Sequence, residues 1–315
     1  MDSFIIICIA LSFAFILEWF VRKLKIDNFD KRFVLVTGCD SGFGLELAKK
    51  LDKMGFNVFA CCLTKSAVEK FNETSSSKLK AIEMDVTKDA SIEKTMEIVK
   101  RRLPNGKGLW AVVNNAGILG GVGPTILHTR QEYENTLAVN LYGVIMVTKA
   151  CLPLVLQEQG RIVNTSSIAG RVAFINSSYT ISKYGVEAFS DVLRREIYRT
   201  GTKVQIIEPG AFKTPIWKPL QQMSVDKIAS LPAEIKSQLP DDAADKMVAP
   251  YKILEETGST QYNLVVDAYI HAITAKFPRK RYLVGTDAKY TYRLLWNLPE
   301  FISDYFFDKQ GIYNV

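Results

Sequence analysis

Residues 33–44, Phe33-Val-Leu-Val-Thr-Gly-Cys-Asp-Ser-Gly-Phe-Gly44, join a short apolar run to a turn that contains three glycines. The run has the β-branched and aromatic residues of a buried strand, and the residues after the turn, to about Met54, predict a helix. Glycines between a strand and a helix let backbone N–H groups at the helix N-terminus approach a pyrophosphate. The spacing G-x-x-x-G-x-G differs from the usual G-x-G-x-x-G, so this turn alone does not decide the function.

Short apolar runs alternate with helical patterns from Lys31 onward. This alternation is typical of βαβ units, and strands so uniformly apolar are typical of a parallel sheet buried on both faces. The sequence therefore predicts an α/β fold, a doubly wound parallel sheet of the Rossmann type, as a single domain over residues 31–289. The expected strands are 33–37, 57–62, 79–84, 111–114, 161–167, 204–207 and 282–284.

Residues 211–262 break this alternation with helical sequence that contains no obvious strand. They lie between the sixth and seventh strands, at the carboxyl edge where doubly wound sheets bind ligands. A surface excursion and a substrate lid are both compatible with that position. We favour the lid because apolar side chains are available for contacts, namely Trp217, Leu220, Met223 and Ile228.

The N-terminal residues 1–25 contain a candidate membrane anchor. Apart from Glu18, residues 4–21 carry no charge, and a membrane-spanning helix needs roughly 17–25 residues. A cleaved signal peptide would begin with basic residues, whereas Asp2 is the charge that precedes this apolar run. The basic flank at residues 22–25 places the folded part in the cytosol by the positive-inside rule. We therefore expect an uncleaved anchor.

The composition excludes several classes of function. The chain has 40 Lys+Arg against 33 Asp+Glu, a net charge of +7, which suits a membrane surface or an anionic cofactor. It has no Lys/Arg run with interleaved aromatics, so no nucleic-acid partner is expected. The five cysteines form no C-x-x-C pair, which predicts reduced thiols. With only His128 and His271 available, multi-histidine metal sites and Ser-His-Asp hydrolysis are disfavoured, and we predict no metal site.

Two further motifs carry chemistry. Asn114-Asn-Ala-Gly117 follows the fourth predicted strand, where a simple turn is the plain interpretation. Tyr179-Thr-Ile-Ser-Lys183 opens a predicted helix over residues 179–199, so the phenol and the ammonium share one face. A nearby cation lowers a tyrosine pKa from its usual ~10, which suits a general acid or base. On its own, this pair is more often a solvated helical pair.

The order of the motifs is more specific than any one of them. The glycine turn, Asn114–Gly117, the pair Ser166-Ser167, Tyr179/Lys183 and Pro209-Gly210 follow one another along the chain. In this order the sequence resembles the short-chain dehydrogenase/reductase superfamily over residues 31–289. It is most similar to the retinol and hydroxysteroid dehydrogenase (17-beta, 3-alpha) branch. That closer resemblance rests on residues 37–44 (TGCDSGFG), 107–110 (KGLW), 181–189 (ISKYGVEAF) and 207–210 (IEPG).

The resemblance implies an NAD(P)-dependent alcohol dehydrogenase or carbonyl reductase acting on a lipophilic alcohol such as a retinol or hydroxysteroid. It implies that Tyr179 is the acid/base and that Lys183 lowers the tyrosine pKa and holds the nicotinamide ribose. It implies that Ser167, or alternatively Ser166, hydrogen-bonds the reacting oxygen, and that Asn140 supports a proton relay through water. The implied cofactor-binding residues, besides Tyr179 and Lys183, are Gly38, Asp40, Ser41, Gly42, Phe43, Gly44, Asp85, Asn114, Ala116, Gly117, Pro209, Gly210 and Thr214.

Within that set, the resemblance assigns Asp85 to the adenine, Asn114 to the wall of the cofactor cleft and Thr214 to the nicotinamide amide or a phosphate. The choice between NAD and NADP is less direct. Cys62 stands where an aspartate usually marks NAD, and Leu63 stands where NADP enzymes often have arginine. Asp40 disfavours a 2′-phosphate whereas Lys65 favours one, and we expect NAD, with NADP as the alternative.

The remaining expectations concern the C-terminal tail, the location in the cell and the oligomeric state. Members of this branch tend to carry an N-terminal anchor and an apolar C-terminal tail, here residues 290–315 with Leu294-Leu-Trp296 and Tyr305-Phe-Phe307. We expect a membrane-bound protein of the endoplasmic reticulum with the catalytic domain facing the cytosol, a lumenal orientation being the alternative. A homo-oligomer through the helices after Asn140 and Tyr179 is an implication of the family.

Two alternative functions remain. One is the same chemistry on a small hydroxy acid such as 3-hydroxybutyrate, which the anchor and the apolar lid disfavour. The other is a non-catalytic, cofactor-binding membrane scaffold, which the complete Ser/Tyr/Lys/Asn set disfavours.

Overall fold

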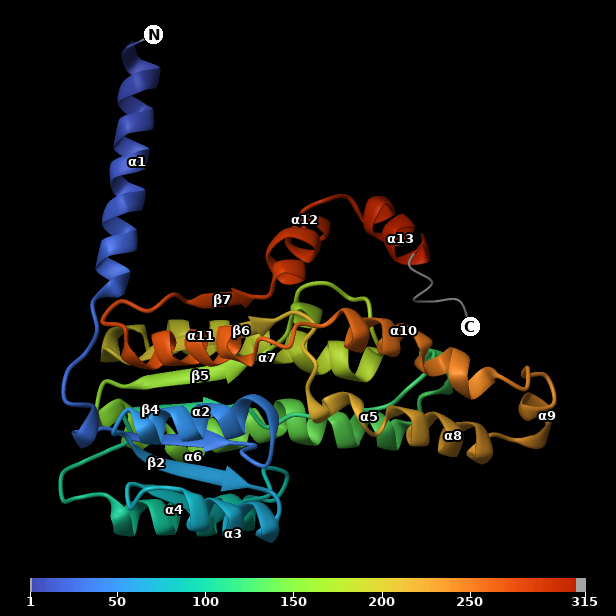
Figure 1. The fold of residues 1–315 in the computed structure, drawn as a ribbon, viewed down its shortest axis with the longest axis horizontal. Helices are drawn as coiled ribbons and strands as arrows, with labels where there is room; N and C mark the ends of the chain where they lie inside the picture. The colour runs from blue at the N-terminus through green and yellow to red at the C-terminus, as the bar shows by residue number, and fades with distance from the viewer. Residues whose placement is uncertain (1, 310–315) are drawn as a thin grey trace.

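A computed structural model describes residues 2–309 as a seven-stranded parallel sheet with helices on both faces (Figure 1). The strand order is β3-β2-β1-β4-β5-β6-β7, so the chain changes direction between β1 and β4, where doubly wound sheets bind ligands. The predicted fold class is confirmed. The strands are β1 Phe33–Thr37, β2 Asn57–Cys62, β3 Leu79–Glu83, β4 Ala111–Asn114, β5 Arg161–Thr165, β6 Lys203–Pro209 and β7 Arg281–Val284.

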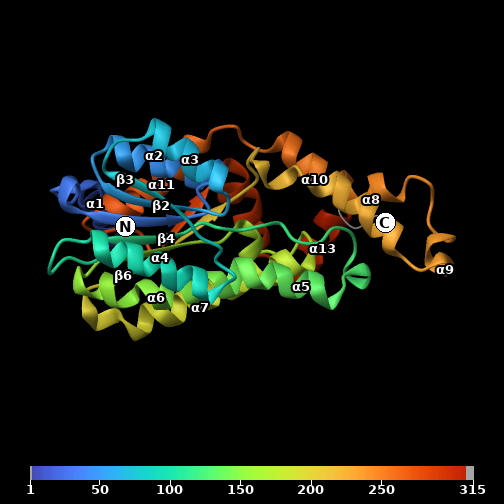
Figure 2. The same cartoon turned by 90° about the horizontal axis from the view of Figure 1, so that it is seen from below.

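Two helical layers cover the sheet, one on each face (Figure 2). One layer consists of α2 (Gly42–Lys53), α3 (Lys65–Thr74) and α11 (Tyr262–Thr274). The other consists of α4 (Asp89–Arg102), α6 (Gly143–Gln157) and α7 (Ser177–Glu196). A short helix, α5 (Arg130–Leu137), and a π-helical turn at Ala138–Tyr142 lead into α6.

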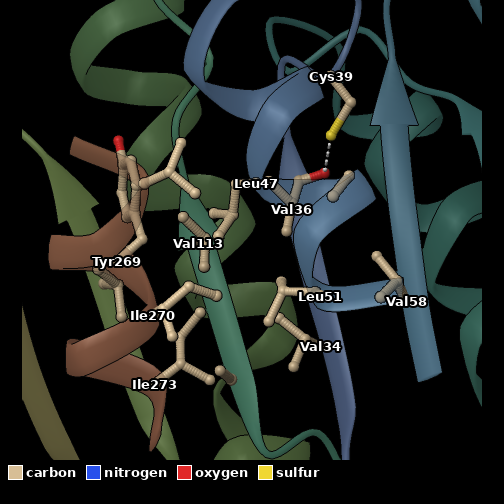
Figure 3. Packing of buried hydrophobic residues seen from close by; sticks show 14 of the residues in the cluster. Val34, Val36, Cys39, Leu47, Leu51, Val58, Val113, Tyr269, Ile270 and Ile273 are labelled. Carbon is tan, nitrogen blue, oxygen red and sulfur yellow. Dashed lines mark hydrogen bonds between the residues drawn. The ribbon is translucent and has the colours of Figure 1, made fainter. Parts of the chain in front are cut away.

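Successive residues of β1 point to opposite layers. Val34 and Val36 pack with α2 and α11, as Figure 3 shows, whereas Leu35 packs with the layer that contains α4 and α6. All three side chains are fully buried, which explains why β1 is apolar at these successive positions.

Strand ends differ from the sequence-based expectations where other contacts decide them. β5 ends at Thr165, two residues early, because Ser167 leaves the strand and caps a short 3₁₀ turn at Ile168–Gly170. β6 continues to Pro209 because β7 pairs with it as far as Pro209 and Val284. Helix α7 begins two residues before the predicted start, at Ser177, because Asn176 caps it.

The segment predicted as a lid is mostly helical and extends away from the sheet (Figure 1). It comprises a 3₁₀ turn at Pro215–Trp217 followed by α8 (Leu220–Ser230), α9 (Ala233–Lys236) and α10 (Ala243–Thr257). A β-bridge between Phe212 and Ser259 joins its two ends.

After β7 the chain forms a π-helical turn at Asp287–Tyr292, then α12 (Arg293–Leu295) and α13 (Glu300–Lys309). The predicted apolar tail is therefore helical as far as it is described. Residues 310–315 of that tail lie outside the described residues.

The N-terminal helix α1 (Asp2–Lys23) stands apart from the domain (Figure 1). Among residues 2–309, two helical stretches are long and apolar enough to cross a membrane, Phe4–Lys23 and Arg130–Gln157. The second comprises α5 and α6, which pack against the domain, with 39% of its most apolar window buried, whereas none of the first is buried. The five cysteines are free thiols; Cys8 is exposed on α1 and the other four are buried in the domain.

Candidate active site

A cavity of about 640 Å³ opens at the carboxyl ends of the strands. Its size lies within the usual range for small-molecule sites, roughly 300–1,000 Å³. Its walls come from the glycine turn, the ends of β4 and β5, the first turn of α7, the segment after β6, the lid and the C-terminal segment. Of the predicted site residues, these line it: Gly38, Asp40, Ser41, Gly42, Phe43, Asp85, Ala116, Gly117, Ser167, Tyr179, Lys183, Pro209, Gly210 and Thr214.

The glycine turn forms a cradle at the N-terminus of α2. Gly38 and Gly42 have φ angles of +68° and +60°, which side chains rarely allow, and a Cβ at Gly42 would meet only Pro215 within 4 Å. Ser41, the N-cap of α2, makes no side-chain capping bond, so the first N–H groups of the helix keep their donors for another acceptor. Free donors at the positive end of a helix fit the pyrophosphate of a dinucleotide.

Gly44 does not line the cavity, and its contact with the cofactor stays a prediction. A Cβ there would lie 2.3 Å from the Gly38 carbonyl oxygen and 2.5 Å from Nδ2 of Asn115. Gly44 therefore lets α2 pack directly on the glycine turn, so its role in the structure is to support the cradle.

Asn114 also lies behind the cavity wall, contrary to prediction. It is buried, and its Nδ2 donates to Thr148 on α6 and to Asn164 on β5, both at 2.8 Å. The reason is strand alternation, which turns this side chain into the layer that contains α6. The neighbouring Asn115 lines the cavity instead and donates to the carbonyl oxygens of Thr37 (2.9 Å) and Gly38 (3.1 Å). The duplicated asparagine in the motif was the signal for this residue.

Asp40 joins the glycine turn to the segment that follows β2. Its carboxylate accepts hydrogen bonds from the backbone N–H groups of Leu63 (2.8 Å) and Thr64 (2.9 Å) and from the Thr64 hydroxyl (2.8 Å). Asp40, Leu63 and Thr64 line the same part of the cavity, whereas Lys65 is exposed on α3 and is not among the lining residues. Of these two charged side chains, the Asp40 carboxylate is therefore nearer to the cavity than the Lys65 ammonium.

Asp85 lies on the same side of the cavity. Its Oδ1 accepts from the N–H (3.0 Å) and the hydroxyl (2.7 Å) of Thr87. Partial burial acts to raise the pKa of this carboxyl, but the bonds from Thr87 and the charge of Lys88 outweigh it, so the pKa is lowered.

Tyr179 is held by the cap of its own helix. Asn176 accepts the Tyr179 backbone N–H at 2.7 Å and donates to the Leu119 carbonyl at 3.0 Å, so one buried amide joins α7 to the loop after β4. Sequence reasoning missed Asn176, although an asparagine just before a helical pattern is a common capping signal.

The pKa of Tyr179 corrects a second expectation. Burial raises it to about 12, and a hydrogen bond with Ser167 acts in the opposite direction. Lys183, which was expected to lower it, lies with Nζ 5.5 Å from the ring centroid and donates to the Thr165 carbonyl at 3.0 Å. Burial also lowers the pKa of Lys183 to about 8, against the charge of Glu187.

The two candidate serines occupy different positions. Ser167 hydrogen-bonds Tyr179 and lies 3.5 Å from the Pro209 carbonyl, whereas the Ser166 hydroxyl donates to the Lys183 carbonyl at 3.3 Å. The geometry therefore favours Ser167 as the partner of the tyrosine.

Asn140, in the π-helical turn, is fully buried and is not a lining residue. Its amide exchanges two hydrogen bonds of 2.8 Å with the backbone of residue 118 and donates to Ser182 at 3.1 Å. A Cβ at Gly117 would lie 3.4 Å from Asn140 Oδ1 and 3.6 Å from Lys183 Nζ, so the two side chains meet beside this glycine.

The far wall of the cavity is apolar and comes from three segments. Phe174, from the loop after β5, stacks on Tyr292 with ring centroids 4.5 Å apart, and Trp217 and Met223 belong to the lid. Two other lid residues were singled out in the sequence. Leu220 is buried in one apolar cluster with Phe174 and Tyr292, whereas Ile228 does not line the cavity. Phe174 and Tyr292 were missed because loops and tails have no periodic pattern that reveals burial.

A buried charge cluster lies one helical turn beyond Lys183. Arg281 on β7 contacts Glu187 on α7 (2.9 Å) and Glu208 on β6 (3.3 Å), and Arg171 contacts Glu208 at 3.8 Å. Burial and the neighbouring Glu187 raise the pKa of Glu208 to about 8, against the two arginines.

The comparisons with known proteins agree with this geometry. A family model for short chain dehydrogenases matches residues 32–224. The chain is 42% identical over 305 residues to 17-beta-hydroxysteroid dehydrogenase type 6 of Bos taurus, with 95% of each chain covered. It is 40% identical over 297 residues to retinol dehydrogenase 16 of Rattus norvegicus, covering 93% of this chain and 92% of that one.

A solved short chain dehydrogenase/reductase from Burkholderia phymatum, in complex with NAD, has the same fold. It superposes with a TM-score of 0.70 at 22% identity and covers 86% of this chain and 95% of that one. The fold and the site together define a nicotinamide-dependent oxidoreductase. The chain belongs to the short-chain dehydrogenase family.

The packing of Gly44 generates the first prediction. Gly44→Ala should push the cradle out of shape and weaken NAD binding roughly tenfold or more, since overpacking costs about 1–3 kcal/mol. Fluorescence titration with NADH measures the affinity. Gly106→Ala is the control for the added methyl group, because nothing lies within 4 Å of a Cβ at that position. Its φ of +72° strains the backbone there, away from the cavity. It should cost stability and leave NADH affinity unchanged. Equal affinities for wild type and Gly44→Ala would contradict the proposed packing role.

Glu208 generates a pH prediction. A carboxyl whose folded-state pKa is raised binds more protons in the folded state, so its stabilising contribution decreases as pH rises from its ordinary value near 4.5 to about 8. Glu208→Gln resembles the protonated form and removes that dependence. In urea unfolding at a series of pH values, wild type should therefore lose stability relative to Glu208→Gln between pH 5 and 8. Parallel curves for the two proteins would refute the raised pKa.

Proposed function

We propose that this protein interconverts a lipophilic alcohol, of the retinol or hydroxysteroid class, and its carbonyl form, with NAD as cofactor. The observation that carries the proposal is the position of Ser167, Tyr179 and Lys183 between two unlike surfaces. On one side lies the glycine cradle, with free backbone donors for a dinucleotide. On the other lies the wall formed by Phe174, Trp217 and Tyr292.

The chemistry divides between cofactor and chain. When bound, the nicotinamide supplies a hydride acceptor or donor. Ser167 holds the reacting oxygen, and Tyr179 moves the proton. With a pKa near 12, the Tyr179 hydroxyl is protonated at neutral pH, ready to donate to a carbonyl oxygen in the reducing direction. Alcohol oxidation requires the phenolate, and Lys183 is the cation beside the ring that stabilises it.

Lys183 also has donors for a second task. Its ammonium carries three N–H donors, one of which the Thr165 carbonyl accepts. We assign the remaining donors to the ribose of the cofactor. Asn140 positions the lysine from behind, through its bond to the neighbouring Ser182. Asp40 and Asp85 are assigned to the adenosine side and Pro209, Gly210 and Thr214 to the nicotinamide side.

The substrate class has two supports. The relatives at about 40% identity are named as hydroxysteroid and retinol dehydrogenases. In addition, Lys183 is the one cationic side chain among the described residues that line the cavity. A small hydroxy acid would need a further cation for its carboxylate, so this composition favours an uncharged, apolar substrate.

Location is part of the proposal. The exposed, apolar α1 and the basic residues that follow it support anchoring in the endoplasmic reticulum membrane, with the catalytic domain in the cytosol. A lipophilic substrate partitions into the same bilayer. Homo-oligomerisation remains a family-based expectation.

The central prediction concerns Tyr179. Tyr179→Phe keeps the buried ring and removes the ionisable oxygen, and acid/base groups contribute on the order of 10²–10⁴-fold, so kcat should fall by at least that range. NAD affinity should be retained, whereas Lys183→Ala should lose both turnover and affinity. Steady-state kinetics with retinol and a hydroxysteroid, alongside NADH titration, measure both quantities.

Tyr184→Phe is the control for this experiment, since Tyr184 lies on the same helix but is exposed and does not line the cavity. It should leave kcat unchanged. Near-native turnover of Tyr179→Phe with normal NAD binding would make the proposed chemistry wrong and favour a cofactor-binding scaffold.

Asp40 generates a cofactor prediction. Wild type should prefer NAD over NADP in kcat/KM, and Asp40→Asn should narrow that preference by roughly tenfold, about 1.4 kcal/mol, because it removes a charge near the 2′ position while keeping an acceptor for Leu63 and Thr64. Asp52→Asn is the matched control, since Asp52 accepts from the N–H and hydroxyl of Ser76 in the same manner outside the cavity. A native preference for NADP would show that another group decides.

A further inference from the structure

The C-terminal segment 287–309, here called the cover, has two unlike faces. Tyr292, Leu295 and Phe307 are buried against the domain. By contrast, Tyr290 and Phe301 are each 72% exposed, Tyr305 65% and Leu294 59%. Single exposed apolar residues are ordinary, but four large ones in one short segment mark an interaction surface.

The buried face of the cover reaches the substrate cavity directly at Tyr292 and, at Phe307, through one intervening ring. Phe307 stacks on Phe174 with centroids 5.6 Å apart, and Phe174 and Tyr292 both line the cavity. Arg171 lies over the ring of Trp296 at 5.0 Å, which adds a contact between the cover and the loop after β5. The cover is therefore a thin layer between the cavity and its own exposed side.

Helices α12 and α13 of the cover lie on the side of the domain from which α1 emerges (Figure 1). Helix α1 is fixed to the domain at its base. Backbone bonds join Ile26 to Thr274 (2.8 Å) and Lys276 to Leu24 (2.8 Å), and the His271 ring bonds the Arg22 carbonyl at 2.9 Å. Whatever surface holds α1 therefore faces the cover.

Given the anchoring proposed above, we propose that the cover lies in the headgroup region of the same bilayer and forms the lipid-facing wall of the substrate cavity. Tyrosine is suited to this depth because its ring is apolar and its hydroxyl is polar, and phenylalanine and leucine add apolar area. The exposed charges of the cover are mixed, with Lys289, Arg293 and Lys309 against Glu300, Asp304 and Asp308.

The acidic residues limit the depth of insertion. Asp304 and Asp308 are exposed on α13 together with Phe301 and Tyr305, and a carboxylate within the hydrocarbon is costly. The helix therefore lies parallel to the surface and contributes apolar area, and it does not span the membrane. A lipophilic alcohol dissolved in the bilayer would reach Phe174 and Tyr292 from the cover without crossing water.

The test uses the full-length protein in vesicles of phosphatidylcholine with a minority of phosphatidylserine. A nitroxide on the native Cys8 reports on α1. In a Cys8→Ser background, Phe301→Cys reports on the cover, and Glu97→Cys on the exposed side of α4 is the aqueous control. Accessibility to oxygen, which concentrates in lipid, is compared with accessibility to a water-soluble nickel chelate.

The proposal expects the label at 301 to resemble that at Cys8, shielded from the nickel chelate, while the label at 97 is open to it. If Cys8 is in lipid but 301 resembles 97, the cover does not dock and the anchor stands. If 301 is shielded from both reagents with or without vesicles, a protein covers this face and the proposal is wrong. A Cys8 label in water removes the anchoring itself, and with it the proposal.

A kinetic measurement adds an independent readout. Phe301→Asp with Tyr305→Asp should raise KM for retinol delivered in vesicles by roughly tenfold, about 1.4 kcal/mol, and leave KM for a short water-soluble alcohol unchanged. Equal KM values for vesicle-delivered retinol in wild type and the double variant would contradict the entry route.

Discussion

The close approach of the glycine turn to β4 is the constraint on which the site depends. Gly44 has no side chain, so α2 can lie directly on Gly38, and Asn115 then closes the gap by bonding the carbonyl oxygens of Thr37 and Gly38. The first residues of α2 and Gly117 line the cavity beside this contact. Gly117 in turn leaves room for Lys183 and Asn140. A single methyl group added at Gly44 would therefore displace the glycine turn and Asn115, and with them the neighbouring residues of the site.

The catalytic side is attached to that frame by polar groups that are buried and paired. Asn176 joins the start of α7 to Leu119, and Lys183 is bonded to the end of β5 at Thr165. Buried polar groups with well-made bonds specify one arrangement, because the alternatives leave them unpaired. The price is electrostatic: burial raises the pKa of Tyr179 to about 12 and lowers that of Lys183 to about 8, so the phenol is neutral at neutral pH whereas the lysine keeps its charge by a narrow margin.

Most of the fold and much of the site could be predicted from the sequence. Apolar runs identified the seven strands, and most of the site residues predicted from the ordered motifs line the cavity. Gly44 and Asn114 do not line the cavity, and the sequence could not show this because a motif gives the order of residues but not which of them face the cavity. The pKa of Tyr179 was predicted with the wrong sign because spacing reveals the nearby cation but not the burial. Phe174, Tyr292 and the Glu208 cluster depend on contacts between distant segments, which no local pattern records.

The four buried cysteines have a consequence for where such an enzyme can work. Burial raises the pKa of Cys62 and Cys151 to about 12 and that of Cys39 and Cys61 well above the ordinary value. The thiolate is the form that reacts with oxidants and disulfides, and these thiols are both protonated and inaccessible. The folded domain is therefore indifferent to the redox state of its surroundings. Under the proposed anchoring, these thiols would therefore favour neither the reducing cytosol nor the oxidising lumen as the side of the membrane for the domain.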